Sequence, residues 1–358
     1  MKLLCAACLA ILTVAAAAQA PPAVILVTLD GARIEEVFGG LDVSIVQSQL
    51  KPGQRAEDQA LYKRYWAPTP EQRREKLMPF FWGTLMRAHG SIAGNPALGS
   101  RVSLTNKHWF SYPGYSEILV GRAHDDAIKS NDPVRNPNTT VLEYLRASQR
   151  LSRDQVAAFA SWSVFSAIVE KTEGSIAVNA GYQPYESASP QVRRDSALQF
   201  ETPTPWDSVR HDAYTVRFAL DHLDRHRPRV LYLALGETDD WAHDGRYDRV
   251  LETYTRTDHY LKQLWDWLQA QPEYRDRTSI LITTDHGRGR TPADWRDHGE
   301  KVAGAGETWM AFVSPSWPRR GEWRNHPPIS ASQVAATLID WSGGDWKRFA
   351  DAAAPIRP

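Results

Sequence analysis

Acidic and imidazole side chains follow several apolar runs of this chain. In the stretch ILITTDHGRG, Asp285 and His286 come directly after a run that is typical of a buried strand. Asp30 ends the run AVILVTLD, and Asp239 and His243 lie shortly after VLYLALG. Because unpaired polar groups are costly to bury, an Asp–His pair at the end of a buried strand needs partners.

Together these side chains suit a divalent metal ion. Asp239 and His243 are four residues apart, so one helical turn would place both on the same side. His298 follows in WRDHGEKVAG, and three Asp with three His make a ligand set suited to zinc or manganese. The two cysteines, Cys5 and Cys8, lie in the first twenty residues, so the rest of the chain must use carboxylate and His ligands.

Each candidate has a simpler explanation when taken alone. Asp30-Gly31 is a common turn, Asp239 could cap a helix, and a single His such as His298 is usually a surface residue. Their occurrence together after three strand candidates favours the metal site.

Ser111 is the candidate nucleophile, in SYPGYSEILVG. A serine where a loop meets a helix can lie near amide N–H groups and the positive end of the helix dipole, which suits a phosphate. Without metal ligands nearby, the same serine would be interpreted as a helix N-cap.

The elements that must position these residues alternate between strands and helices. Continuous apolar runs predict buried strands at 23–29, 156–160, 230–235, 279–283 and 308–313. Amphipathic patterns predict helices at about 71–88, 247–268 and 333–341. We therefore predict an α/β fold, a three-layer α/β/α sandwich with a mostly parallel central sheet. The carboxyl ends of its parallel strands would bring distant residues together at one edge.

The organisation of the chain suggests export. Residues 1–20 combine Lys2, an apolar run and Ala18-Gln19-Ala20, which predicts a signal peptide and a periplasmic or secreted protein. Residues 21–358 are predicted to form a single catalytic domain, with a cap insertion at about 40–100 and a second long loop at 180–210. No later run is long enough for a membrane span, and a net charge of zero indicates no nucleic-acid surface. The oligomeric state stays open.

The ordered set VTLDGAR, SYPGYSEILVG, GETDDWAH, TTDHGRG and a later His resembles the alkaline phosphatase superfamily. Within it, the chain is similar to the nucleotide pyrophosphatase/phosphodiesterase-like branch, and the resemblance runs through most of the chain. It implies an alkaline phosphatase-like fold with two divalent ions, which are zinc in many relatives, with Mn²⁺ as an alternative.

The resemblance also implies roles for individual residues. The two ligand sets would be Asp30, Asp285 and His286 for one ion, and Asp239, His243 and His298 for the other. Ser111 would face the first ion as the nucleophile, and Asn131 would contact a phosphate oxygen. His298 lies nearer to His286 than the last His of this branch usually does, so His326 is the alternative ligand.

The implied activity is hydrolysis of a small-molecule phosphate ester through a phosphoserine intermediate. Ser111, where the diesterase branch usually has Thr, favours monoesters. Asn131 favours diesters, as does the lack of an evident phosphate-clamping Arg, since Arg288 is expected to be a solvated side chain. The sulfatase pattern Cys/Ser-x-Pro-x-Arg is not matched, because Tyr115 stands where the Arg should be.

Two other functions stay open. A cofactor-independent phosphoglycerate mutase-like enzyme would share the metal ligands and the serine, but the leader and the short 111–239 interval argue against it. A non-catalytic relative that only binds metal or phosphate would keep the scaffold without the reaction.

Overall fold

The computed structural model describes residues 22–349 and 352–358. The predicted signal peptide at 1–20 lies outside the described residues. Among the helices of the described part, none combines the length and the apolar character that crossing a bilayer requires.

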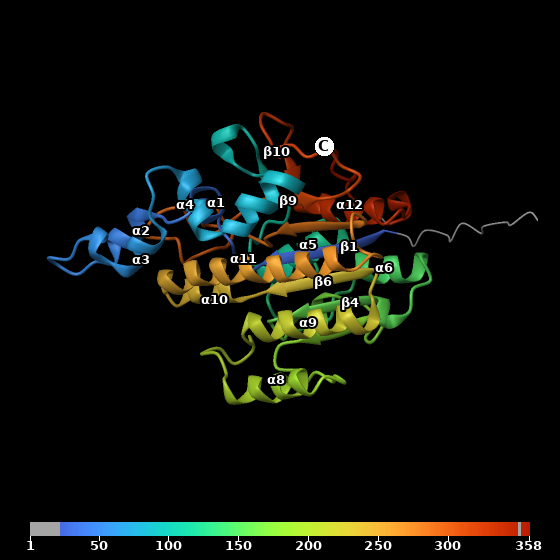
Figure 1. The fold of residues 1–358 in the computed structure, drawn as a ribbon. Helices are drawn as coiled ribbons and strands as arrows, with labels where there is room; N and C mark the ends of the chain where they lie inside the picture. Colours follow the sequence, from blue (N-terminus) through green and yellow to red (C-terminus); the bar gives the residue numbers. More distant parts are fainter. Residues whose placement is uncertain (1–21, 350–351) are drawn as a thin grey trace, which may run out of the picture.

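An eight-stranded sheet runs through the centre of the molecule (Figure 1). Its strands lie in the order β10 (Gly321–Glu322), β2 (Gly90–Ala93), β9 (Met310–Val313), β7 (Thr278–Thr283), β1 (Ala23–Leu29), β6 (Val230–Leu235), β4 (Val156–Ala160) and β5 (Ala177–Ala180). The five strands from β7 to β5 are parallel, whereas β9 runs antiparallel to both β7 and β2. A second, three-stranded sheet contains β11 (Ile329–Ser330), β3 (Val102–Ser103) and β8 (Glu307–Thr308).

Strand β1 shows how the sheet divides the core in two. Ile25 and Val27 pack into one apolar cluster, and Val24 and Leu26 pack into the other. Successive side chains of a strand point to opposite faces, so a continuous apolar run fits a strand that is covered on both faces.

Helices form the two outer layers. One face is covered by α1 (Ile34–Gly39), the π-helix η2 (Phe81–His89), α9 (Asp212–His226) and α11 (Tyr247–Ala270), as Figure 1 shows for α9 and α11. The other face is covered by α5 (Ser111–Val120), α6 (Val141–Ser148), α7 (Phe165–Ile168) and α12 (Val334–Trp341). The predicted three-layer fold is therefore confirmed.

Three segments differ from the prediction in detail. The run 308–313 divides into β8 and β9, because the buried Trp309 stands between them and its indole N–H donates to the Ala32 carbonyl. Strands β2 and β5 were not predicted, since each has only four residues and both are rich in Gly, Ala and other small residues. Within 180–210 lies α8 (Pro190–Glu201), which packs on α9 and begins with an N-cap serine followed by proline.

The range 40–100 contains more than a cap. Helices α2 (Val43–Ser48), α3 (Ala60–Tyr65) and α4 (Pro70–Leu77) lie beside α1 and α11 at one end of the sheet (Figure 1). The last part of the range forms η2 and β2, which belong to the core and to the central sheet. The last of the three helices beside the sheet, α4, ends at Leu77, and the predicted cap at 40–100 stays a prediction.

The helix that carries Ser111 packs tightly against the end of β7. A Cβ atom at Gly114 would lie 2.2 Å from the Asp285 carbonyl oxygen, which is a backbone atom that cannot move away easily. Only glycine allows this approach, so Gly114 sets the distance between α5 and the Asp285–His286 turn.

We expect Gly114→Ala to lower the free energy of unfolding by about 1–3 kcal/mol, because the added methyl group overpacks the contact with Asp285. Gly83→Ala is the matched control. It also lies in a helix, but its Cβ would have no atom within 4 Å, so its stability should equal or exceed that of the wild type. Urea unfolding followed by circular dichroism measures both, and equal stabilities would contradict the tight contact.

Candidate metal centre

Three neighbouring strands bring the predicted ligands to one edge of the sheet. Asp30 follows β1, and Asp285 follows β7, which is its neighbour on one side. On the other side β6 leads into α10 (Glu237–His243), which carries Asp239 and His243. The start of α10 is held by the buried Asp212, whose carboxylate accepts the Gly236 N–H at 2.9 Å.

The first group consists of Asp30, Asp285 and His286, all buried. The His286 Nε2 atom lies 3.4 Å from Asp30 Oδ1 and 3.5 Å from Asp285 Oδ2. One ligand atom from each residue lies within 4.8 Å of the others, which is close enough for a single ion. This group has the same members as the first predicted ligand set.

The second group consists of Asp239, His286 and His298. Asp239 Oδ1 lies 3.6 Å from His286 Nε2 and 4.0 Å from His298 Nε2. His243 stands beside this group, since its Nε2 atom is 3.1 Å from Asp239 Oδ2 and 3.0 Å from His298 Nε2. The prediction assigned His286 to the first ion only, whereas the structure places it between the two groups.

The protonation states suit metal binding. Burial lowers the pKa of His298 and of His243, so both imidazoles are neutral at pH 7 and keep a lone pair for a ligand bond. Burial alone would lower the pKa of His286 too, but Asp285 and Asp30 outweigh it and raise that pKa to about 9. Burial, together with the charge of Asp30, raises the pKa of Asp285. A metal ion would replace the proton that these groups otherwise share.

Two hydrogen-bonding details show that the residues fit a metal. Among the described residues, Asp285 Oδ2 is buried without a hydrogen-bond partner, although Asp285 Oδ1 accepts the Gly31 N–H at 3.0 Å. The other ring nitrogen of His286 donates to the Gly287 carbonyl at 2.8 Å, which leaves Nε2 facing the carboxylates. Such a bond is the usual way in which a protein orients a metal-ligating imidazole.

Ser111 lies at the first group. It is the first residue of α5 and is buried, and its hydroxyl oxygen is 3.5 Å from both Asp30 Oδ1 and His286 Nε2. The hydroxyl therefore faces the position where the first ion would bind, which is where a nucleophile needs to be.

Asn131 contacts Tyr112, the residue that follows Ser111. Its side-chain oxygen accepts the Tyr112 N–H at 2.9 Å, so this amide of the helix N-terminus already has a partner. The Asn131 side chain is otherwise exposed, and its amide nitrogen is the part that can donate to a phosphate oxygen. The sequence suggested that a free backbone N–H at the start of the helix would bind phosphate. In the structure the Tyr112 N–H is bonded to Asn131, and the side-chain amide of Asn131 is the available donor instead.

The alternative ligand His326 is elsewhere. Its Nε2 atom is 2.7 Å from the Ser100 hydroxyl, and its ring packs against Trp323. In the described part of the chain, neither of the two candidate ligand groups includes it. The geometry thus favours His298 over His326 as the last metal ligand.

Several contacts around the centre were not predicted. The Tyr115 hydroxyl donates to Asp30 Oδ2 at 2.9 Å, and burial raises the Tyr115 pKa, which keeps that proton in place. Thr238 donates to the Asp30 carbonyl at 2.5 Å. Tyr115 is four residues after Ser111, so the sequence could have indicated that both side chains lie on the same face of a helix.

Arg288 contradicts the prediction of a solvated side chain. It is only 2% exposed, and its guanidinium donates to the Asp239 carboxylate. Burial lowers the Arg288 pKa to about 9, so the side chain stays charged at pH 7. Sequence spacing gave no sign of this contact, because Arg288 and Asp239 are distant in the chain.

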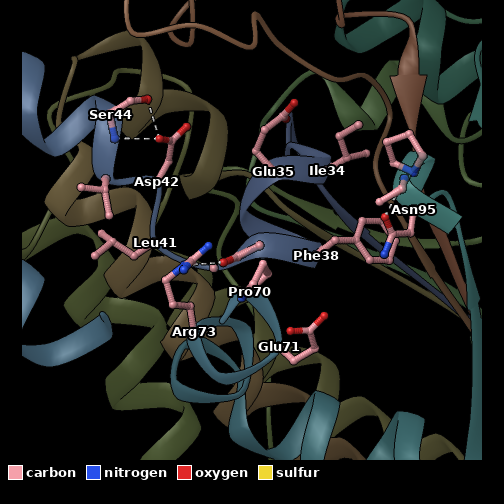
Figure 2. A pocket seen from close by; sticks show the side chains of 15 residues that line it. Ile34, Glu35, Phe38, Leu41, Asp42, Ser44, Pro70, Glu71, Arg73 and Asn95 are labelled. Atoms are coloured by element: carbon pink, nitrogen blue, oxygen red, sulfur yellow. Dashed lines mark hydrogen bonds between the residues drawn. The ribbon is translucent and has the colours of Figure 1, made fainter. Parts of the chain in front are cut away.

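A cleft of about 500 Å³ lies between α1, the start of α4 and residues 95–97 (Figure 2). Its floor is apolar, with Ile34, Phe38 and Leu41, and Glu35 and Glu71 lie at its rim. None of the predicted site residues lines it. The cleft and the Asp/His groups are thus separate features.

The buried Asp/His groups beside a serine form a candidate metal site, and comparison with known proteins gives the family. Residues 58–338 match the model of the type I phosphodiesterase / nucleotide pyrophosphatase family. The chain therefore belongs to this family, within the alkaline phosphatase superfamily. No curated protein sequence matches it significantly.

Solved structures share the fold at low sequence identity. The phosphonate monoester hydrolase of Silicibacter pomeroyi matches with a TM-score of 0.56 at 11% identity, over 93% of this chain and 75% of that one. A 2-O GAG sulfatase matches with a TM-score of 0.56 at 12% identity, over 93% and 73%. The lipoteichoic acid synthase LtaP of Listeria monocytogenes matches with a TM-score of 0.53 at 8% identity, over 90% and 72%.

We expect His298→Ala to lose one of two bound ions per chain, and His326→Ala, the matched control, to keep both. His298 is next to Asp239, whereas His326 is bonded to Ser100. Elemental analysis of the purified variants, with folding checked by circular dichroism, measures this. Loss of an ion in His326→Ala alone would restore His326 as the ligand.

Proposed function

We propose that this protein is an exported hydrolase of small-molecule phosphate esters that uses Ser111 and two divalent ions, most simply Zn²⁺. The observation that carries the proposal is the pair of Asp/His groups sharing His286, with the Ser111 hydroxyl 3.5 Å from His286 and Asp30. Membership of a phosphodiesterase and pyrophosphatase family supports the reaction class.

Two divalent ions, when bound, would polarise the phosphoryl oxygens and lower the pKa of a nearby hydroxyl. Asp30, Asp285 and His286 would hold the ion next to Ser111. Asp239 and His298, with His243 beside them, would hold the other.

The protein side chains do the positioning. The Ser111 oxygen would attack phosphorus to form a phosphoserine as the P–O ester bond breaks, and the leaving alcohol would take up the proton that the hydroxyl loses. Water would then hydrolyse the phosphoserine, which releases phosphate when the substrate is a monoester and a phosphate monoester when it is a diester. Tyr115 and Thr238 fix Asp30 next to the serine from two sides. Asn131 would donate to a phosphoryl oxygen, and its own position is fixed by the Tyr112 N–H.

The charge around Ser111 favours a diester as the substrate. A phosphodiester carries one negative charge, whereas a monoester carries up to two at pH 7. Asn131 offers a neutral donor, and the guanidinium of Arg288 is turned to Asp239. A serine nucleophile still favours monoesters. The diester and monoester versions of the proposed function therefore predict different preferred substrates.

We expect Ser111→Ala to lower turnover by roughly a thousandfold or more while both ions stay bound, because the nucleophile is removed and the ligands are untouched. The substrates are nitrophenyl phosphate and bis-nitrophenyl phosphate, and nitrophenyl sulfate tests the sulfatase reaction. Faster hydrolysis of the bis-nitrophenyl ester would support the diester version, and the reverse the monoester version. Unchanged rates in Ser111→Ala would instead favour a non-catalytic binder.

We expect Asn131→Ala to lower kcat/KM by about 100-fold, as removal of a single oxyanion donor does in other hydrolases. Ser130→Ala is the control, because Ser130 is exposed and its hydroxyl bonds to Asp132. If both variants retain wild-type kcat/KM, Asn131 has no contact with the phosphoryl group.

Export and domain boundaries are also part of the proposal. The sequence pattern at 1–20 supports a cleaved leader, and the α2–α4 segment is a candidate cap. Mass spectrometry of the mature N-terminus of secreted or periplasmic protein tests cleavage after Ala20.

A further inference from the structure

Arg288 connects two segments that carry metal ligands. One amino group of its guanidinium donates to the Asp239 carbonyl at 3.1 Å and also to Asp239 Oδ1. The other amino group donates to the carbonyl of Arg296, two residues before His298. A single buried side chain thus joins α10 to the loop that carries His298.

The guanidinium also lies across the turn that follows Asp30. A Cβ atom at Gly31 would be 2.8 Å from Arg288 Nε and 2.5 Å from Asp239 Oδ1. Gly31 has a φ of +56°, a conformation that glycine adopts without strain. The absence of a side chain at Gly31 is therefore what lets Arg288 reach Asp239.

The contact fixes the orientation of the Asp239 carboxylate. Oδ1 is held by Arg288, and Oδ2 lies 3.1 Å from His243 Nε2. A carboxylate oxygen has more than one lone pair, so Oδ1 can accept from Arg288 and still face the imidazoles of the second group. Without the guanidinium, both the rotation of Asp239 and the position of the His298 loop would be less restricted.

The first group does not need this support. Asp30 is held by Tyr115 and Thr238, and Asp285 accepts the Gly31 N–H. His286 is oriented by the Gly287 carbonyl. Loss of Arg288 should therefore affect the two groups unequally.

We propose that Arg288 is a positioning residue that selectively supports the ligands of the second ion, which are Asp239 and His298 with His243 beside them. This inference rests on the proposed two-ion function. Supporting residues of this kind typically change metal affinity 10–100-fold when they are removed.

The experiment is a calorimetric titration of metal-free protein with Zn²⁺. The wild type should bind two ions per chain. In Arg288→Met, one ion should bind as in the wild type and the other about 10–100-fold more weakly. Arg290→Met is the matched control, because Arg290 lies in the same loop but is largely exposed and pairs with Glu35 and Glu307. It should keep both affinities.

The outcomes separate the inference from the proposed function. Two unchanged affinities in Arg288→Met, a tighter second ion, or equal weakening of both ions would each overturn the role of Arg288. A wild type that binds fewer than two ions would overturn the proposed function itself. If Arg288→Met does not fold, Arg288→Lys decides, since lysine lacks the planar fork that reaches both Asp239 and Arg296 and should also weaken one ion only.

Discussion

The structure depends on the burial of three carboxylates at one edge of a parallel sheet. Asp30, Asp239 and Asp285 converge there, and one oxygen of Asp285 has no hydrogen-bond partner in the described part of the chain. Buried charges are costly unless they are compensated. Divalent cations would supply that compensation most directly, and in the proposed function the serine hydroxyl beside them is the nucleophile.

The central sheet brings the three carboxylates together and holds them on rigid elements of the fold. The strands β1, β6 and β7 are adjacent and parallel, so the residues that follow them meet at the same edge. The ligands lie after strand ends and on the short helix α10, except His298, which lies on a loop. The first turn of α10 is anchored by Asp212. Glycine at positions 31 and 114 allows the backbone and the neighbouring side chains to approach closely.

The two metal-binding groups are supported by different means. The first has neutral hydrogen-bond donors, such as the hydroxyl groups of Tyr115 and Thr238. The second has a buried cation, Arg288, which also links α10 to the following loop. Since the Arg288 guanidinium is bonded to Asp239, the proposed function assigns recognition of the phosphoryl group to the ions and to Asn131. Monoesters and diesters differ in charge, so comparing them tests this assignment.

The sequence alone determined the layered fold and the chemistry of its candidate centre, because buried parallel strands leave continuous apolar runs and the polar residues that end them stand out. It could not show that His286 lies between both groups, that His326 is bonded to Ser100, or that Arg288 is buried on Asp239. These facts depend on contacts between residues far apart in the chain. Periodicity describes only the local environment of a residue, whereas its partners are decided when the strands and helices pack together.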